Sequence, residues 1–365
     1  GKNQRTTRAQ KPDSIAMRTN GLFDLVHAKT DDAYTGFDVN RKVLFLKNSG
    51  WIVSDYILPP AGTHTYRQAW HPDARNNLTV DPKTKVMRTN FSNQANISVV
   101  PADPESLEAV RDKEYLVTND LPELEDYVRY ERIDAEGPQT FDTVLYPDRL
   151  GTNTEIGITR LQMEGVPTET ATALSIDFDG DRTGTYYLCN ETAFPQRTFG
   201  GFTYNGELAY VEKKRDGRFV QAAITGGSSL IQGNCRLFWS EHPVEDLGLE
   251  WGTGVLYLSS SAEKPAGDLK VYAPGGIQKV VYNGAEVAFT YDDDTVTTRA
   301  EEKTGSGGGI PAGSPGGVGK PGGSFATPVP TPTPTPSESP APTPSETPGT
   351  DPAPFTDIAG HWAEE

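Results

Sequence analysis

The sequence predicts an all-β protein, an antiparallel β-sandwich of stacked sheets in two regions, followed by a disordered C-terminal linker. Short segments that alternate apolar and polar residues recur along the first 300 residues, and turn dipeptides such as Asp-Gly and Asn-Gly separate them. This pattern is typical of hairpins in sandwiches. The linker follows from composition, because 14 of the 29 prolines lie in residues 304–354. Such a segment buries too little apolar surface to offset its chain entropy.

Hairpins are the first elements that the pattern predicts. Strands at residues 41–46 and 51–57 flank a turn, and a second pair is expected from residues 128–132 and 141–146 around Gly137. Glycine turns predict four more hairpins, because glycine supplies the positive φ that tight turns need. These glycines are Gly180, Gly206, Gly217 and Gly284.

One helix is expected in the first region. Asp103 is a suitable N-cap, Pro104 suits the first helical position, and Leu107 and Val110 follow with i, i+3 spacing.

The chain of 365 residues divides into four predicted parts. A first β-sandwich region spans residues 1–168 and a second spans residues 169–303, with a Gly-Val-Pro interruption near the boundary. The linker occupies residues 304–354, where Thr-Pro repeats favour extended polyproline II. Residues 355–365 begin another module. The chain also lacks an initiator Met and a signal core, so we expect it to be a fragment.

Charge excludes one class of partner, and hydropathy excludes a membrane span. The chain holds 50 acidic and 33 basic residues, a net charge of −17, of which residues 1–303 carry −12. An acidic folded region repels phosphates, so we expect no nucleic-acid partner. No apolar run has the length that a membrane span needs, so none is expected.

The last 11 residues resemble the opening of an S-layer homology repeat. The residues that fit its pattern are Phe355, Asp357, Ile358, His361, Trp362 and Ala363. The resemblance implies attachment to secondary cell-wall polysaccharide through a complete repeat, and hence an extracellular place on a bacterial cell surface. The alternative is the start of an amphipathic helix that Asp357 caps.

Four segments of the first region are similar to the C-terminal half of heparinase II/III-like polysaccharide lyases. They are an Arg-rich strand at 41–46, a strand ending in Asp at 51–55, a His-containing strand ending in Trp-His at 64–71, and a Thr-x-Leu-x-Pro segment at 143–147. Residues 1–4 also fit the end of a motif that follows a His in this family.

This resemblance implies a lyase that joins an α/α toroid to a β-sandwich and cleaves a uronate-containing acidic polysaccharide by β-elimination. The family's catalytic residues would lie upstream of Gly1, so none is assigned in this chain, and the fragment alone should be inactive. A divalent metal, Ca or Zn, is possible in the parent protein. The alternative is a non-catalytic cell-surface protein for carbohydrate binding or adhesion.

Arg67 and His71 are the candidate substrate-binding residues. They have the same parity in one strand and therefore share a face, whereas His64 points to the other face. A guanidinium and an imidazole could jointly meet an acidic sugar. Ordinary sheet-face polarity, with Tyr66 and Trp70 packing on the core, explains the same residues, and we favour this simpler interpretation.

Alternating carboxylates suggest a metal site. Asp177, Asp179 and Asp181 resemble a Ca²⁺ loop, but an EF-hand needs Gly and Glu where Arg182 and Leu188 stand. An Asp-Gly hairpin turn explains the same residues.

Two further pairs leave alternatives open. Cys189 and Cys235 could form a disulfide or remain buried thiols. Trp239 and Trp251 could stack on sugar, although aromatic residues in sandwiches usually fill cores.

Overall fold

The computed structural model describes residues 13–298 except 32, 33, 35, 73, 75, 76, 119 and 120. The expected linker at 304–354 and the module at 355–365, with Phe355, Asp357, His361 and Trp362, lie outside the described residues. The all-β prediction is confirmed, because the described residues form four sheets and only one short 3-10 helix. Among the described residues, every strand pair is antiparallel except β22 (Val255–Ser259) with β24 (Lys279–Tyr282). In the described part, no helix is long and apolar enough to cross a membrane.

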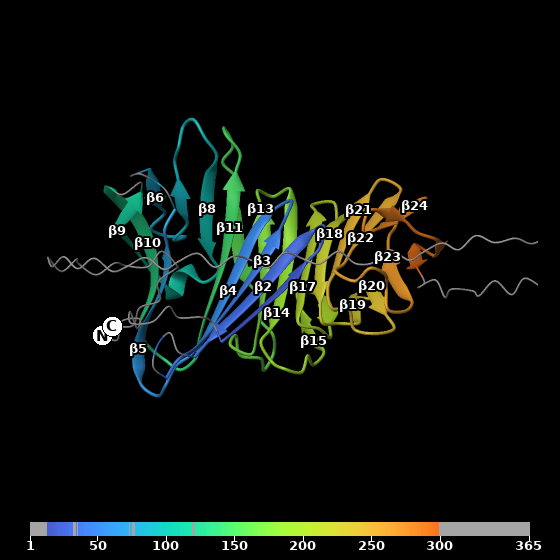
Figure 1. Ribbon diagram of the computed structural model, residues 1–365, viewed down its shortest axis with the longest axis horizontal. Helices are drawn as coiled ribbons and strands as arrows, with labels where there is room; N and C mark the ends of the chain where they lie inside the picture. Colours follow the sequence, from blue (N-terminus) through green and yellow to red (C-terminus); the bar gives the residue numbers. More distant parts are fainter. Residues whose placement is uncertain are drawn as a thin grey trace, which may run out of the picture. The chain divides into compact units, whose positions relative to one another are not determined.

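Two of the sheets come from the first half of the chain (Figure 1). The eight-stranded sheet, in spatial order, contains β1 (Ser14–Thr19), β2 (Phe23–Thr30), β3 (Asp38–Leu46), β4 (Gly50–Leu58), β11 (Gln139–Asp148), β8 (Asn96–Pro101), β7 (Met87–Thr89) and β6 (Leu78–Val80). The three-stranded sheet contains β5 (Thr63–Trp70), β10 (Leu121–Glu136) and β9 (Glu108–Thr118).

The other two sheets follow along the chain. The nine-stranded sheet, in spatial order, contains β12 (Ile156–Arg160), β13 (Ala171–Phe178), β14 (Arg182–Cys189), β17 (Leu208–Lys214), β18 (Phe219–Thr225), β21 (Leu247–Gly252), β22 (Val255–Ser259), β24 (Lys279–Tyr282) and β25 (Ala285–Glu286). The seven-stranded sheet contains β15 (Arg197–Phe199), β16 (Phe202–Tyr204), β19 (Ser229–Gln232), β20 (Cys235–Ser240), β23 (Leu269–Tyr272), β27 (Thr295–Thr298) and β26 (Phe289–Asp292).

The four sheets stack face to face in the order three-, eight-, nine- and seven-stranded (Figure 1). Three apolar cores separate them. Tyr66 and Tyr130 of the three-stranded sheet pack on the eight-stranded sheet. Leu44 of the eight-stranded sheet packs with Tyr186 of the nine-stranded sheet in the second core. The third core, between the nine- and seven-stranded sheets, includes Tyr187.

The central strands of the two inner sheets are buried on both faces, because each of these strands lies between two neighbouring sheets. Successive residues of a strand point to opposite faces, so Tyr186 and Leu188 of β14 enter one core while Tyr187 and Cys189 enter the next. All four are essentially inaccessible to solvent.

Most of the predicted hairpins are present. β3 pairs with β4, as predicted from residues 41–57. The turns at Gly180, Gly217 and Gly284 join the paired strands β13–β14, β17–β18 and β24–β25. Asp179 and Gly180 both have positive φ, 55° and 69°, at the centre of a turn that the Asp181 amide closes by donating to the Phe178 carbonyl oxygen at 3.1 Å.

Two hairpin predictions are wrong because the chain changes sheet at the turn. β10 pairs with β5 and β9, while β11 pairs with β4 and β8, so Gly137 joins two different sheets. Likewise, β16 and β17 on either side of Gly206 belong to the seven- and nine-stranded sheets. A turn motif reports local backbone geometry and carries no information about which strand becomes the partner.

The predicted helix at Asp103 is also wrong. A 3-10 turn covers only Pro104–Ser106, and Asp103 makes no side-chain cap. Its carboxylate instead accepts hydrogen bonds from Arg132 and Arg160, at 3.3 and 2.5 Å. Leu107 is buried in the core between the three- and eight-stranded sheets, and its extended backbone leads directly into β9. Tertiary contacts therefore override the local helical signal.

The chain passes from the eight- to the nine-stranded sheet before residue 168, and the division into two regions at that residue stays a prediction. β12 already pairs with β13 in the nine-stranded sheet, so the change of sheet falls between Asp148 and Ile156. The eight- and nine-stranded sheets share one core, and both lie in a single compact unit.

Candidate functional site

Residues from the four segments that carry the family resemblance meet in one buried polar network. Arg41 on β3 donates two hydrogen bonds to Asp55 on β4, at 2.7 and 3.2 Å. Gln68 on β5 donates to the same carboxylate at 2.7 Å, and its own carbonyl oxygen accepts from Trp70 and Thr143, at 3.1 and 2.8 Å. We call these five residues the Asp55 network.

Burial dominates the electrostatics of this network. Asp55 and Gln68 are fully inaccessible to solvent. Burial raises the pKa of Asp55, and the guanidinium of Arg41 and the amide of Gln68 oppose that shift. The network ties β3, β4 and β11 of the eight-stranded sheet to β5 of the three-stranded sheet. Its residues therefore fix the position of β5 relative to the eight-stranded sheet.

A second buried cluster joins the eight- and nine-stranded sheets. The carboxylate of Asp142 on β11 accepts from Ser54 at 2.5 Å and from Thr172 at 2.8 Å, and it lies 2.8 Å from the guanidinium of Arg160. Burial opposes the charge of Arg160, but Asp142 and Asp103 outweigh it and raise the pKa of that guanidinium. The buried carboxylate thus has three partners, two of them on the nine-stranded sheet, and they stabilise the contact between the two sheets.

A third ionic cluster lies between the same sheets. Glu207, which precedes β17, lies 2.7 Å from Arg18 on β1 and 3.2 Å from Lys42 on β3. Lys42 also donates to the carbonyl oxygen of Cys189 at 3.0 Å. Burial would raise the pKa of Glu207, but Lys42 and Arg18 together hold it below its ordinary value. Burial lowers the pKa of Lys42, although Glu207 opposes this shift.

The structure places Arg67 on the outer face of the three-stranded sheet, away from the eight-stranded sheet. Its Nε lies 2.8 Å from the Glu131 carboxylate on the neighbouring strand β10. Arg129 approaches the same oxygen at 3.0 Å. Two guanidinium groups thus share one buried carboxylate on this face.

His71 follows the end of β5, next to the same face. Its ring stacks on Tyr127 of β10 at a centroid distance of 4.6 Å, and Nδ1 lies 3.7 Å from the Glu114 carboxylate. His64 lies instead beside Phe37, in the direction of Tyr66. The parity argument for these two histidines therefore holds, while the substrate-binding role of Arg67 and His71 stays a prediction.

The three aspartates of the suggested metal loop lie around the β13–β14 turn. The Asp177 carboxylate accepts a hydrogen bond from the backbone of Gly180 at 2.9 Å, which stabilises the turn. Among the described residues, no three or more His, Cys, Asp or Glu side chains come together to hold a metal ion, and this includes Asp177, Asp179 and Asp181. The hairpin turn accounts for Asp177, and a metal-binding role of the three aspartates stays a prediction.

The remaining candidates are the two cysteines and the two tryptophans. Cys189 and Cys235 are both free thiols, and burial raises the pKa of each. Trp251 donates to the carbonyl oxygen of Tyr272 at 3.0 Å and packs on Phe219, against the core between the nine- and seven-stranded sheets. Lys270 lies over the ring of Trp239 at 5.3 Å.

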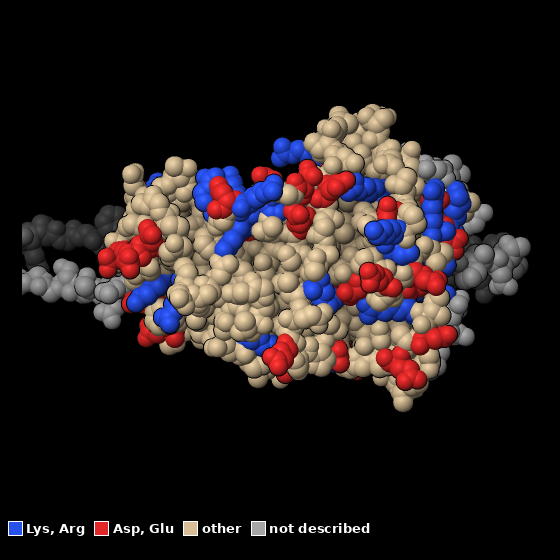
Figure 2. All heavy atoms as spheres, turned by 180° about the vertical axis from the view of Figure 1, so that it is seen from behind, with Lys and Arg blue, Asp and Glu red and all other residues tan. Residues whose placement is uncertain are grey.

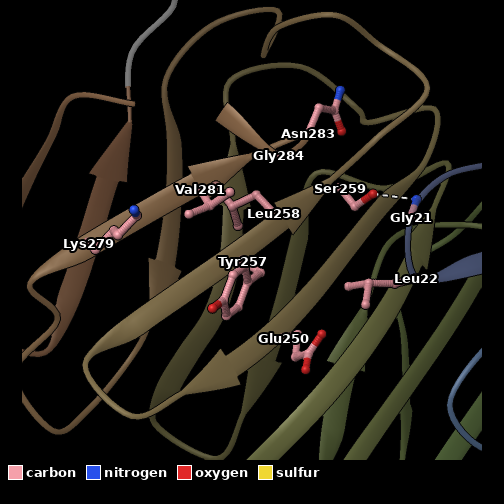
Figure 3. Close-up of a pocket in the computed structure, with 10 residues that line it drawn as sticks. All are labelled: Gly21, Leu22, Glu250, Tyr257, Leu258, Ser259, Lys279, Val281, Asn283 and Gly284. Carbon is pink, nitrogen blue, oxygen red and sulfur yellow. Dashed lines mark hydrogen bonds between the residues drawn. The ribbon is translucent and has the colours of Figure 1, made fainter. Parts of the chain in front are cut away.

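A groove of about 680 Å³ opens on the nine-stranded sheet (Figure 3). Five strands of this sheet, β12, β13, β14, β17 and β18, pack on the eight-stranded sheet. β21, β22 and β24 turn the same face of the sheet to the groove. Glu250, Tyr257 and Val281 lie opposite one another on these strands and form its floor. Gly21 and Leu22, in the β1–β2 turn, form one wall. We call this site the Tyr257 groove.

Sequence reasoning missed both the Asp55 network and the Tyr257 groove. The alternation of side chains along β22 predicts which residues share a face with Tyr257. It does not predict that the eight-stranded sheet ends before it reaches this face. Gln68 and Thr143 lie 75 positions apart, and only the sheet order brings them together.

Comparisons with known proteins give partial structural likenesses. No family model and no curated protein matches the chain. Among solved structures, heparan sulfate lyase HepC from Pedobacter heparinus is 18% identical with a TM-score of 0.42, over 49% of this chain and 27% of that one. A heparinase III structure is 14% identical with a TM-score of 0.41, over 48% and 27%. The chain therefore spans less than a third of these proteins, and TM-scores below 0.5 do not establish a shared fold.

Proposed function

We propose that this chain is the β-sandwich region of a polysaccharide lyase similar to heparinase II/III-like enzymes, acting by β-elimination on a uronate-containing acidic polysaccharide. The observation that carries the proposal is the Asp55 network. Each of the four segments that resemble the family contributes at least one member, and together they bond into one buried unit. The four segments are therefore neighbours in space as well as similar to the family in sequence, which supports the resemblance.

The chemistry defines what this region would leave to the rest of the enzyme. β-Elimination requires neutralisation of the C5 carboxylate, removal of the C5 proton and protonation of the leaving O4. In this proposal the acid and base belong to a helical toroid that precedes Gly1. The Asp55 network then positions β5 and the outer face with Arg67 and His71. A metal, if the parent uses one, would be held outside the described residues.

An uncovered apolar face supports the presence of another domain. Ile15 and Met17 of the edge strand β1 are 64% and 62% exposed. Met17 and Val26 lie opposite each other on the face that turns toward the three-stranded sheet, and Phe45 and Trp51 stack at 4.7 Å on the same face. Apolar faces of this kind are typical of contacts with another domain. The helical toroid is the occupant that this proposal assigns.

Charge restricts the substrate. Lys and Arg alternate with Asp and Glu across the face shown in Figure 2, so acidic and basic side chains are interspersed there. The sequence before the linker is also acidic overall. A polyanion would then be recognised by a locally basic site, rather than by the broad basic surface that a highly sulfated chain favours.

The proposal includes the place of the protein. Through the Pro-rich linker and a complete S-layer homology domain, the enzyme would bind secondary cell-wall polysaccharide on a bacterial surface. This part depends on Phe355, Asp357, His361 and Trp362 and on the resemblance alone.

The coding sequence upstream of Gly1 tests the proposal. A helical region of roughly 300 residues, ending in a His-Asn-Thr segment, is the expected finding, since that is the size of domain the resemblance implies. A secretion signal directly before Gly1 would contradict it and would favour the alternative, a non-catalytic surface protein for carbohydrate binding or adhesion.

A further inference from the structure

We propose that the Tyr257 groove binds a neutral oligosaccharide, with one sugar ring stacked on Tyr257 and sugar hydroxyl groups donating to Glu250. This site is separate from the acidic substrate of the proposed lyase. It would let the β-sandwich region recognise a second, uncharged glycan.

The exposed ring of Tyr257 is the first argument. It is 42% exposed, and it is the one aromatic side chain among the large apolar residues exposed in the described part of the chain. A Cβ atom added at Gly252 would lie 3.3 Å from the ring, so the absence of a side chain there leaves room for the ring to lean over the sheet. An aromatic ring on an open sheet face offers an apolar platform with a polar tip. The C–H face of a sugar fits such a platform.

The unused polar groups of the groove define the ligand's chemistry. Neither the Glu250 carboxylate nor the Tyr257 hydroxyl has a hydrogen-bond or ion-pair partner among the described residues. By contrast, Lys279 pairs with Glu286 at 3.0 Å, and the hydroxyl of Ser259 accepts from Gly21 at 2.5 Å. An ionised carboxylate only accepts hydrogen bonds, so the ligand has to donate them. Hydroxyl groups of a neutral sugar do so, whereas a uronate would bring a second negative charge close to Glu250.

The groove is preorganised, because buried contacts hold its wall. Asn20 donates to the buried carboxylate of Asp246 at 2.7 Å and accepts from Leu22 at 2.9 Å. A Cβ atom at Gly248 would lie 2.9 Å from Leu22, so the turn packs closely on the sheet. A rigid wall reduces the entropy that ordering a site on binding would cost.

Titration calorimetry with the full 365-residue chain tests the inference. The probes are three neutral hexasaccharides (cellohexaose, mannohexaose and chitohexaose) and a galacturonate hexamer. We expect at least one neutral probe to bind more tightly than the galacturonate hexamer. Tyr257→Ala should weaken that binding about tenfold, a loss of about 1.4 kcal/mol, while Tyr257→Phe should retain most of it. Glu250→Gln should weaken binding of the neutral probe. It should also reduce the difference in affinity between the neutral probe and the galacturonate hexamer, because it removes the negative charge.

Leu150→Ala, at another exposed apolar side chain (60%), is the matched control and should change nothing. Thermal melting of each variant checks the fold. The inference is overturned if no neutral probe binds, if galacturonate binds more tightly, or if Tyr257→Ala binds like Leu150→Ala. It is also overturned if Tyr257→Ala abolishes self-association instead, since a second copy would then cover the groove. None of these outcomes bears on the upstream sequence, so the lyase proposal stands or falls separately.

Discussion

The substitution Glu207→Gln tests whether the eight- and nine-stranded sheets depend on the ionic cluster between them. Glu207 and Lys42 have side chains that are only 8% and 7% exposed, and their charged groups lie 3.2 Å apart. Breaking one side of a buried pair typically costs about 3–5 kcal/mol, because a charge remains buried without compensation. Arg18 is 27% exposed and lies 3.9 Å from Glu245, so it retains a partner. Most of the cost therefore comes from Lys42, and we expect a loss of about 3 kcal/mol.

Urea denaturation followed by tryptophan fluorescence measures this loss. The matched control is Glu286→Gln, whose pair with Lys279 is 66% and 47% exposed, and which should change the free energy of unfolding by at most about 1 kcal/mol. The pKa of Glu207 is lowered in the folded protein. Its stabilising effect is therefore complete above the ordinary glutamate pKa and is lost as pH falls through the lowered value. The difference in the free energy of unfolding between wild type and Glu207→Gln should therefore become smaller in acid. A loss below about 1 kcal/mol at neutral pH, or a difference unchanged in acid, would refute the reasoning.

Three further predictions concern the core and the thiols. Leu174 lies in the core between the eight- and nine-stranded sheets, and Leu174→Ala should lower the free energy of unfolding, measured by urea titration, by about 3 kcal/mol. A loss no larger than that of Leu150→Ala, at an exposed side chain, would show that Leu174 is not buried in a core. Asp142→Asn should lower the free energy of unfolding by about 2–4 kcal/mol in the same assay, because the new amide group would face the donors Ser54, Thr172 and Arg160. An unchanged urea midpoint would show that these hydrogen bonds are not made. Without reductant, a thiol reagent should modify half-buried Cys235 slowly in the folded protein and Cys189 only after unfolding; finding no free thiol in the unfolded chain would indicate a disulfide.

Local features of the fold were predictable, and the choice of partner strands was not. The Asp179–Gly180 turn follows from the two residues that adopt positive φ, so the β13–β14 hairpin can be predicted from a short stretch of sequence. The change of sheet at Gly137 depends on which distant strands need a partner. The helix expected at Pro104 is absent because of distant residues as well. Arg132 and Arg160 both bind the carboxylate of Asp103, which therefore does not cap a helix.

The candidate sites show the same division. Parity correctly predicts the opposite directions of His64, in β5, and His71, directly after β5, because alternation is a local property of a strand. The pairing of Arg67 with Glu131 could not be predicted, because the two residues lie 64 positions apart. The exposure of Tyr257 depends on where the eight-stranded sheet ends, and this is a property of the whole stack.

Formation of unsaturated uronate products, followed by ultraviolet absorbance, tests the lyase proposal most directly. The assay compares the product of the complete gene, including any sequence before Gly1, with the 365-residue chain, on a panel of uronate polysaccharides. We predict turnover by the complete protein on at least one of them and none by the chain alone. Turnover by the chain alone would show that the acid and base lie within it, and no turnover by the complete protein on any uronate polysaccharide would contradict the proposal.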